Sequence, residues 1–354
     1  MHKILSINPG STSTKISIHE DEKLISLHTI RHSGEELKQY PRIFDQFNFR
    51  KELILKLLKE DNISLDNLSA VVGRGGMLRP LESGVYNINL KMIDDVRNAR
   101  FGEHASNLGC VLANEIASGI SGCRAFIVDP VCVDELQDVA RLSGLPEFPR
   151  RSLFHALNHK AVARKYAAAH GTEYEKLNLV VAHLGGGISV AAHRLGKVID
   201  VNQALDGYGP FSPERAGTVD AGQMIETCFK GEKSKSEIRK MLVGNGGLMA
   251  HLGTNEVTNA VTLADNGNEY AKLVLEAMAY NVSKEIGAMI AALRGDVDAI
   301  ILTGGIAYST MIVSYITRSV KHFSKVIIYP GEDEMSALAF AGLRVLNGEE
   351  TKEY

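Results

Sequence analysis

Two segments of the chain, one in each half, have the pattern of a strand, a turn rich in glycine and small hydroxyl residues, and a second strand. The first joins a strand at residues 3–7 to one at 16–18, and the second joins 179–183 to 188–191. A hairpin of this composition exposes backbone N–H groups and short hydroxyls, which suit phosphate oxygens. The pattern therefore predicts two similar domains that hold a polyphosphate between them.

The composition is that of a globular protein without nucleic-acid or membrane partners. The chain has 354 residues, which suits two domains of about 100–200 residues each. Its net charge of −3 and the lack of a basic run argue against nucleic acid and a membrane surface. No apolar stretch approaches the ~20 residues of a membrane span, and no export signal is recognisable. We expect a cytoplasmic protein.

The expected elements follow a similar order in both halves, which indicates a duplicated α/β unit. Further strands are expected at residues 24–30, 71–72, 124–128, 197–201, 298–302 and 325–329. Residues 35–60 are expected to form one or two helices, and further helices are expected at residues 103–120, 152–170, 267–293 and 334–346, with Ser152 as the cap of the one at 152–170. We expect an N-terminal domain at residues 1–150 and a C-terminal nucleotide-binding domain at 151–332. The last helix, within 333–354, is expected to pack back on the first domain.

Neither of the common nucleotide motifs is present. The Walker pattern and the Rossmann glycine pattern both open a helix, whereas the glycine turns here lie between two strands. One such turn alone would be read equally well as a tight hairpin. Two in corresponding places, together with Thr-Gly-Gly at residues 303–305 after a buried strand, favour phosphate binding.

The chain resembles the acetokinase family of the actin, sugar kinase and acetate kinase ATPase superfamily. The resemblance covers residues 4 to about 347, and within the family it is closest to the members that act on butyrate. Its motifs are Asn-Pro-Gly-Ser-Thr-Ser-Thr-Lys at residues 8–15, Phe-His at 154–155, His-Leu-Gly-Gly-Gly-Ile-Ser at 183–189 and Gly-Tyr-Gly-Pro-Phe-Ser-Pro-Glu-Arg-Ala-Gly at 207–217.

This resemblance implies both a fold and a reaction. The fold is α/β, with two similar ribonuclease-H-like (actin-like ATPase) domains, each a mixed sheet flanked by helices, and a cleft between them. The reaction is a reversible, direct in-line transfer of phosphate from ATP to a carboxylic acid, giving ADP and an acyl phosphate. ATP or ADP and Mg²⁺ are the implied cofactors, and a homo-oligomer, a dimer or larger, is the implied assembly.

The resemblance assigns catalytic roles to five residues. A carboxylate is ionised at neutral pH and needs no general base, so the enzyme must align it and spread positive charge around the transition state. Arg74 and Arg215 match the family's active-site arginines, and guanidinium groups suit this task. His155 matches the histidine that contacts the phosphoryl group, although alone it would be read as structural. Asp129 matches the carboxylate that serves Mg²⁺, although alone it could be a turn residue. Asn8 matches the asparagine of the first hairpin, near the phosphates and metal.

Other positions match the family's nucleotide and acyl sites. Ser11 and Ser13 supply hydroxyls in the first hairpin, and His183 precedes the glycines of the second. The implied nucleotide-binding backbone comprises Gly185, Gly186, Gly187, Gly304, Gly305 and Ile306. For the acyl substrate the implied residues are Gly75, His104 and Phe154.

Two departures from the acetate kinases matter. Tyr308 stands where those enzymes have a glutamate that serves the metal, so the second metal-site carboxylate is in question. Arg74 is followed directly by Gly75, whereas acetate kinases have branched residues there. A lost side chain should enlarge the acyl pocket, and each buried CH₂ of substrate contributes up to ~0.8 kcal/mol. We therefore expect butyrate in preference to acetate.

Several alternatives remain open. A propionate or branched-chain fatty-acid (isobutyrate) kinase would use the same residues. An actin-like nucleotide-dependent scaffold shares the fold, although Arg74 and Arg215 argue against it. A sugar kinase would need a carboxylate base, and Asp129 could be that base.

Overall fold

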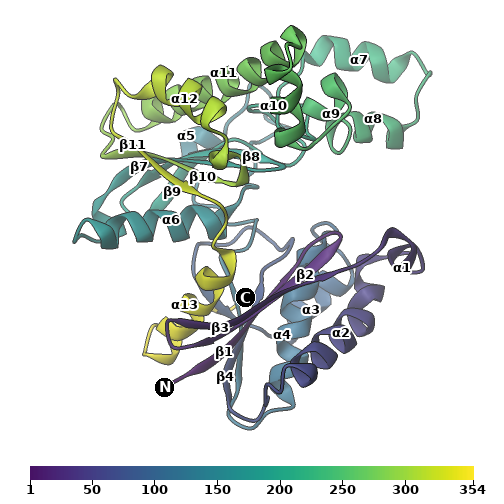
Figure 1. Ribbon diagram of the computed structural model, residues 1–354, viewed down its shortest axis with the longest axis vertical. Coiled ribbons are helices and arrows are strands. Elements are labelled where there is room, and N and C mark those ends of the chain that lie inside the picture. The colour runs from purple at the N-terminus through teal and green to yellow at the C-terminus, as the bar shows by residue number, and fades with distance from the viewer. The chain divides into compact units, whose positions relative to one another are not determined.

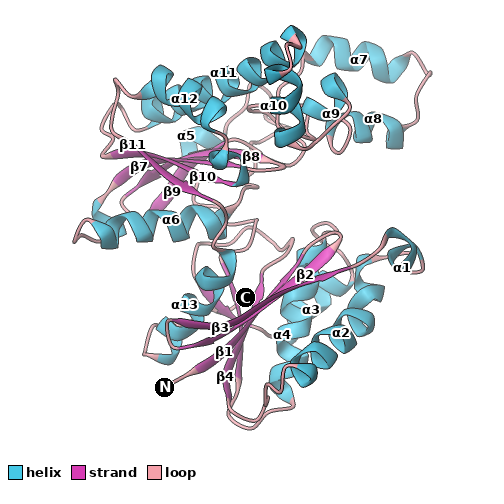
Figure 2. Cartoon of the chain, viewed as in Figure 1, coloured by secondary structure: helices cyan, strands magenta, loops and turns pink.

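The computed structural model describes residues 1–354, and the chain forms two compact units. Unit 1 consists of Met1–Val133, Ala156–Asn158 and Asp333–Tyr354, and unit 2 consists of Asp134–His155 and His159–Glu332. The chain first passes from unit 1 to unit 2 after Val133, earlier than the expected boundary at residue 150. Figures 1 and 2 show the two units with their sheets and helices.

Unit 1 is built on a mixed sheet of six strands in the order β3-β2-β1-β4-β6-β5. Strands β1, β2 and β3 are antiparallel neighbours, β1, β4 and β6 run parallel, and β5 is antiparallel to β6. The strands are β1 Lys3–Pro9, β2 Ser13–Glu20, β3 Lys23–Arg31, β4 Leu68–Arg74, β5 Val85–Asn87 and β6 Arg124–Val128. Nearly all residues of β1 and β4, which lie at the centre of the sheet, are buried, so both faces of these strands are covered.

Helices cover both faces of this sheet. Helices α2 and α4 pack on one face, and α13 packs on the other, where Leu338 and Ala339 meet Ile4 and Val72. The C-terminal helix therefore belongs to the core of unit 1. The helical segments are α1 Gly34–Lys38, η1 Ile43–Gln46, α2 Phe47–Glu60, α3 Leu90–Arg97, η2 Ala105–Asn107, α4 Leu108–Ser118 and α13 Glu334–Leu346.

Unit 2 has a five-stranded sheet in the order β11-β10-β7-β8-β9. The strands are β7 Asn178–Leu184, β8 Ile188–Arg194, β9 Lys197–Val201, β10 Ala299–Gly304 and β11 Val326–Pro330. Helix α11 packs against one face, and α6 contributes to the core on the other. The helical segments are α5 Asp138–Arg141, α6 Ala156–Ala169, η3 Tyr174–Lys176, α7 Ala221–Phe229, α8 Lys235–Leu242, α9 Gly247–Leu252, α10 Val257–Asp265, α11 Glu269–Ala292, η4 Gly305–Tyr308 and α12 Thr310–Val320.

The two sheets share one topology. In unit 1 the order β3-β2-β1-β4-β6 has three antiparallel strands followed by two that run parallel to β1. The order β9-β8-β7-β10-β11 in unit 2 has the same directions. The expected pair of similar α/β domains is confirmed.

Some predicted element bounds were wrong. Strand β1 extends to Pro9 and β2 begins at Ser13, so the first glycine turn is shorter than residues 8–15. Residues 35–60, by contrast, contain two α-helices, as one of the two expected possibilities had it: α1 ends at Lys38 and α2 begins at Phe47 after the 3₁₀ turn η1.

Helix predictions also failed at two N-termini. Residues 103–120 begin with a 3₁₀ turn at Ala105–Asn107 before α4. Helix α6 begins at Ala156, and its N-cap is His155 rather than Ser152, with no side-chain capping bond. A polar residue before an apolar run signals a cap only where its backbone also adopts the cap geometry.

Candidate active site

In unit 1, Asn8, Arg74 and Glu334 form a closed set of polar contacts. The Asn8 amide donates to Glu334 Oε2 at 2.6 Å, and Arg74 lies 3.1 Å from each carboxylate oxygen of Glu334 through Nη1 and Nη2. Arg74 Nη1 also donates to Asn8 Oδ1 at 3.3 Å. The forked pairing fixes the plane of the guanidinium group.

Glu334 is the residue of this set that sequence reasoning missed. It is the first residue of α13, it is buried, and 326 positions separate it from Asn8. Its only local signal is an acidic residue in the first turn of a helix, which is ordinary. The packing of α13 on the sheet of unit 1 brings it to Asn8 and Arg74.

Asp129 follows β6 and is held by hydrogen bonds to one carboxylate oxygen. Its Oδ1 accepts from the Ser83 hydroxyl at 2.6 Å and from the Gly84 amide at 2.8 Å. The residue is buried and has a φ of 36°, a left-handed conformation imposed by the turn into Pro130. The turn thus holds this carboxylate at the end of a parallel strand.

The space beside Gly75 is filled rather than open. A Cβ at this position would lie 2.5 Å from the Pro130 Cβ and 3.3 Å from Ile127 Cδ1. Glycine is required there because the turn after Asp129 packs against it. The prediction that the missing side chain at Gly75 enlarges an acyl pocket is therefore wrong, because Pro130 and Ile127 fill that space.

The neighbouring loop holds His104. Its Nδ1 lies 2.7 Å from Ser106 Oγ and accepts from the Ser106 amide at 3.2 Å, which caps the 3₁₀ turn. Asn107 in the same turn accepts from the Met77 amide at 2.7 Å, and so ties the turn to the segment after Arg74.

The first hairpin, which carries Ser11 and Ser13, is supported by Arg50, another residue that sequence reasoning missed. Arg50 Nη1 donates to the carbonyl oxygens of Gly10 at 2.8 Å and Ser13 at 3.1 Å, and Nη2 donates to that of Ser11 at 3.3 Å. Burial lowers the pKa of Arg50 to about 10, which leaves it charged at neutral pH. The available signal was an arginine in register with Ile54 and Leu58 on the buried face of α2.

In unit 2, the second glycine turn lies beside Arg215. A Cβ on Gly187 would lie 1.9 Å from Arg215 Nη1 and 2.5 Å from its Cζ, so only glycine fits against this guanidinium. Arg215 Nη1 donates to the Ala204 carbonyl, and its Nε is buried without a hydrogen-bond partner. Burial lowers the pKa of Arg215, while Glu214 and Asp206 oppose that effect.

The loop that carries Arg215 is anchored on the same turn. The Ser212 hydroxyl donates to the Gly186 carbonyl at 2.6 Å. A buried guanidinium beside a glycine turn offers positive charge next to exposed backbone N–H groups, which is an arrangement that suits an anion.

His155 and His183 stack on each other next to the glycines. Their ring centroids lie 3.9 Å apart with an angle of 16° between the planes. His183 Nε2 contacts Glu332 Oε1 at 3.2 Å, and His155 Nδ1 lies 2.9 Å from Ser189 Oγ. Phe154, which precedes His155, packs edge-on against His159 and is buried.

A cavity of about 720 Å³ in unit 2 joins the second hairpin to the segment after β10. Four of the residues implied for the nucleotide site line this cavity: Gly185, Gly186, Gly305 and Ile306. Glu332 lines it as well. Gly304 lies beside it with a φ of 91°, and a Cβ there would meet the Leu184 carbonyl oxygen at 2.4 Å. This volume is in the range of small-molecule and cofactor sites.

Tyr308 lines the same cavity and is 71% exposed. It occupies the position where a metal-site carboxylate was expected from the acetate kinases. A phenol does not replace a carboxylate as a magnesium ligand, since Mg²⁺ prefers carboxylate and phosphate oxygens.

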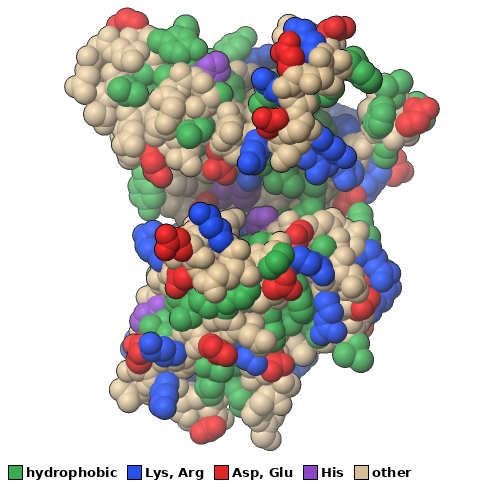
Figure 3. Space-filling view, turned by 90° about the vertical axis from the view of Figure 1, so that its right-hand side faces the viewer, with side chains coloured by type: hydrophobic (Ala, Val, Ile, Leu, Met, Phe, Trp, Pro, Cys, Tyr) green, Lys and Arg blue, Asp and Glu red, His purple; other side chains and the backbone are tan.

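No group of three or more His, Cys, Asp and Glu side chains is arranged to hold a metal ion by itself. Asp129 nevertheless fits Mg²⁺, because this ion usually takes one or two carboxylates and completes its shell with waters and substrate phosphates. None of the helices combines the length and the apolar character needed to span a bilayer. Figure 3 shows acidic and basic side chains interspersed over the face that it draws.

Comparison with known proteins gives the family. The model of the acetokinase family matches residues 147–341, more than half of the chain. Butyrate kinase 2 of Clostridium acetobutylicum is 53% identical over 353 residues, which cover 99% of each protein. The chain belongs to the acetokinase family. A probable butyrate kinase of Clostridium botulinum is also 53% identical over 349 residues, 99% of this chain and 98% of that protein.

Solved structures of two acyl kinases resemble this chain over nearly its whole length. An acetate kinase from Porphyromonas gingivalis matches with a TM-score of 0.81 and 21% identity, covering 98% of this chain and 100% of its own. A propionate kinase from Francisella tularensis subsp. tularensis matches with a TM-score of 0.77 and 19% identity, covering 96% and 99%. The expected fold and family are both confirmed, and membership of a kinase family implies the use of ATP or ADP.

Proposed function

We propose that this protein transfers phosphate from ATP to butyrate, giving ADP and butyryl phosphate, in a direct and reversible step. The observation that carries this proposal is the 53% identity to Butyrate kinase 2 over 99% of both chains. The geometry supports it, because the second glycine turn, the segment after β10 and Glu332 line one cavity in unit 2.

The nucleotide would bind in unit 2. Gly305 and Ile306 would contact adenosine, and the turn of Gly185, Gly186 and Gly187 would meet the phosphates, as in other anion-binding turns. The Gly186 and Gly187 amides would face the anion, since the Gly185 amide donates to the Gly187 carbonyl at 3.1 Å. Gly304 keeps the end of β10 close to the second turn, and His183 would contact a phosphate oxygen. Ser11 and Ser13 of the first hairpin would supply further hydroxyls to the phosphates.

The reaction needs charge and alignment rather than proton abstraction. The butyrate carboxylate is already ionised, since carboxyl groups have pKa values near 4. Arg215, held beside Gly187, would stabilise the phosphoryl oxygens as charge builds up in the transition state. His155 would donate a hydrogen bond to the same group. In unit 1, Arg74 would engage the acyl carboxylate, with its guanidinium plane set by Glu334 and Asn8.

Asp129 would hold Mg²⁺ through its carboxylate, with bound waters completing the shell. When bound, the ion would neutralise the charge of the nucleotide phosphates. The hydrogen bonds from Ser83 and Gly84 fix the orientation of this carboxylate. His104 and Phe154 are proposed to border the acyl chain, and an assembly of two or more copies remains part of the proposal.

The deciding experiment is a hydroxamate assay with ATP, Mg²⁺ and hydroxylamine. Acetate, propionate, butyrate, isobutyrate and valerate are compared at equal concentrations, and we expect most product from butyrate. A peak at isobutyrate or propionate would reassign the substrate within the same class. A protein that forms no hydroxamate with any acid contradicts the proposal, and glucose-dependent or glycerol-dependent ATP consumption would then indicate a sugar kinase. Light scattering on the eluted protein gives the number of copies.

A further inference from the structure

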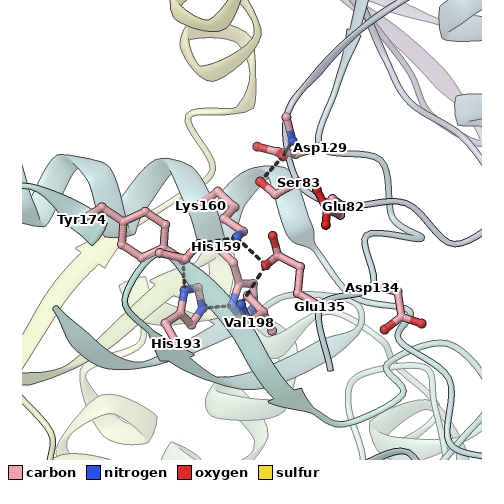
Figure 4. Close-up of polar contacts among 12 residues, drawn as sticks. Glu82, Ser83, Asp129, Asp134, Glu135, His159, Lys160, Tyr174, His193 and Val198 are labelled. Carbon is pink, nitrogen blue, oxygen red and sulfur yellow. Dashed lines mark hydrogen bonds and ion pairs between the residues drawn. The ribbon is translucent and has the colours of Figure 1, made fainter. Parts of the chain in front are cut away.

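A continuous row of polar side chains runs inward from His155 through unit 2. Ser189 Oγ lies 2.9 Å from His155 Nδ1 and 2.8 Å from His159 Nε2. His159 Nδ1 lies 3.2 Å from His193 Nε2, and His193 Nδ1 lies 2.6 Å from the Tyr174 hydroxyl. Figure 4 shows His159, His193 and Tyr174 in contact along this row. The row ends at a phenol, four hydrogen bonds away from His155.

The secondary structure places these residues in register. His155 caps α6 and His159 lies one turn later, so both face the same strand. Ser189 and His193 lie four residues apart on β8, and therefore on one face of it. Ser189, His159, His193 and Tyr174 are all at most 2% exposed. A row of polar groups this deeply buried is stable only when its hydrogen bonds are made.

The two inner histidines are neutral. Burial lowers the pKa of His159 well below its usual value, helped by His183 and Lys160 and opposed by a hydrogen bond with Ser189. Burial also lowers the pKa of His193, helped by His159, Lys160 and Arg164. Lys160 donates at 2.6 Å to Glu135, so the positive charge beside the row is balanced (Figure 4).

A row of neutral rings and hydroxyls in which each inner member both donates and accepts can be ordered in only two directions, because each ring carries one proton and each hydroxyl donates once. The distance of 2.6 Å between Tyr174 and His193 is typical of an O–H donor and short for an N–H donor. A phenol is also a better donor to an imidazole nitrogen than an imidazole N–H is to a phenol oxygen, given their acidities. The favoured order therefore starts with the Tyr174 hydroxyl donating to His193 Nδ1.

The remaining bonds follow from that first one. His193 Nε2–H donates to His159 Nδ1, and His159 Nε2–H donates to the Ser189 hydroxyl. With its single proton kept within the row, Ser189 then donates to His155 Nδ1. His155 in its neutral form consequently carries its proton on Nε2, the ring nitrogen outside the row.

We propose that Ser189, His159, His193 and Tyr174 are positioning residues that fix His155 as the Nε2–H tautomer. In this form a neutral His155 donates a hydrogen bond from Nε2 to an oxygen of the transferred phosphoryl group. The opposite tautomer would present a lone pair to that oxygen and repel it. No proton leaves the row during the reaction, and no bond in it is broken. The inference rests on the proposed function for its role in catalysis, but the tautomer itself does not depend on that function.

The test compares Tyr174→Phe with a matched control. Tyr174→Phe removes only the hydroxyl at the start of the row. Tyr166→Phe is the control, because Tyr166 is similarly buried in the same core cluster but packs at a tilt against His170 and makes no hydrogen bond to the row. Ring ¹⁵N NMR of the protein without substrate reports the tautomer of His155, with the His155→Gln spectrum giving the assignment. Acyl phosphate formation is measured on the same samples.

We expect the wild type and Tyr166→Phe to hold His155 as the Nε2–H form. Tyr174→Phe should show a mixture of tautomers, and its kcat should fall about tenfold while KM for ATP and butyrate stays within about twofold, the scale known for groups that orient a functional residue. Equal thermal midpoints of the two Phe variants would show that the loss is not one of folding.

Several results would overturn the inference. A wild-type His155 in the Nδ1–H form does so directly and requires no variant, even if Tyr174→Phe does not fold. An unchanged tautomer or an unchanged kcat in a folded Tyr174→Phe does so as well. A wild type that makes no acyl phosphate contradicts the proposed function instead, while the NMR result still decides the tautomer.

Discussion

The absence of a side chain at Gly187 leaves the space that the Arg215 guanidinium group occupies. A methyl group on Gly187 would overlap Arg215 Nη1 and Cζ, at 1.9 and 2.5 Å. The constraint is one of space, because a Cβ would fall within the van der Waals radius of these atoms. Sequence patterns alone identify this glycine only as part of a turn.

Gly187→Ala should therefore displace Arg215 and lower kcat by about 10²-fold, the scale of losing one transition-state donor, with little change in thermal stability. Gly186→Ala is the comparison, because its Cβ would meet nothing closer than Glu214 Oε1 at 3.6 Å. A smaller loss is expected from it. Equal losses from both substitutions in the hydroxamate assay would argue that Arg215 is not the group disturbed.

The second prediction at the residue scale separates the structural role of Arg74 from its catalytic one. Arg74→Met leaves the buried Glu334 carboxylate without its cation, which should lower the free energy of unfolding by about 3 kcal/mol. The same change should reduce kcat by about 10²-fold.

The double variant Arg74→Met with Glu334→Gln removes both charges. It should regain most of the lost stability in urea titrations and none of the lost activity. Recovery of activity in the double variant would mean that Arg74 serves only to neutralise Glu334.

At the element scale, the first hairpin depends on helix α2. Arg50 extends from α2 to the carbonyl oxygens of Gly10, Ser11 and Ser13, and its side chain is fully buried. Arg50 occupies these carbonyl groups, and the Gly10 amide donates to the Ser13 carbonyl at 2.7 Å. The hydroxyls and the other backbone amides of the turn are therefore the groups that remain to meet an anion. The turn and the helix form one structural element although 36 residues separate Arg50 from Thr14.

Arg50→Met should remove these bonds and leave several carbonyl oxygens unsatisfied. The free energy of unfolding should therefore fall by about 3 kcal/mol. The looser turn should also raise KM for ATP. Lys51→Met is the control, because Lys51 lies next to Arg50 in α2 and makes a surface ion pair with Glu115 at 3.0 Å. Lys51→Met should lower the free energy of unfolding by less than about 1 kcal/mol. A loss of stability without any change in KM for ATP would show that Arg50 supports folding but not nucleotide binding.

For the whole molecule, buried histidines make stability depend on pH. Burial lowers the pKa of His19 and lowers that of His32 to about 4 in unit 1, and it lowers those of His159 and His193 in unit 2. Unfolding returns each histidine to a pKa near 6.5, so the unfolded chain binds more protons below that value. Stability is therefore complete above pH 6.5 and falls as the pH decreases.

We expect the unfolding free energy, measured in urea at pH 7, 6 and 5, to fall progressively, with a net uptake of more than one proton on unfolding. His32→Gln should reduce that uptake by about one proton between pH 6.5 and 4. His2→Gln is the control, since His2 is not buried in the fold. A stability that does not change between pH 7 and 5 would contradict the prediction.

Much of the fold was predictable because it depends on patterns that are local. The apolar residues of β1 and the apolar runs of β7 and β10 mark buried strands wherever they lie, and the two glycine turns mark hairpins. The same local chemistry pointed to the family and to residues such as Arg215, whose motif is continuous in sequence. The N-terminus of α6 was misplaced because the composition around Ser152 is that of a cap, whereas the residue before the first helical turn is His155.

The sequence alone therefore determined the main strands and the longer helices, the duplicated α/β architecture and the family to which the chain belongs. Only the tertiary structure placed Glu334 beside Arg74, Arg50 beneath the first hairpin and Tyr174 at the end of the histidine row. It also showed that Pro130 fills the space beside Gly75. The physical reason is that contacts between residues far apart in the chain depend on how helices and sheets pack. The periodic pattern of a segment shows which face is buried but not which residues that face meets.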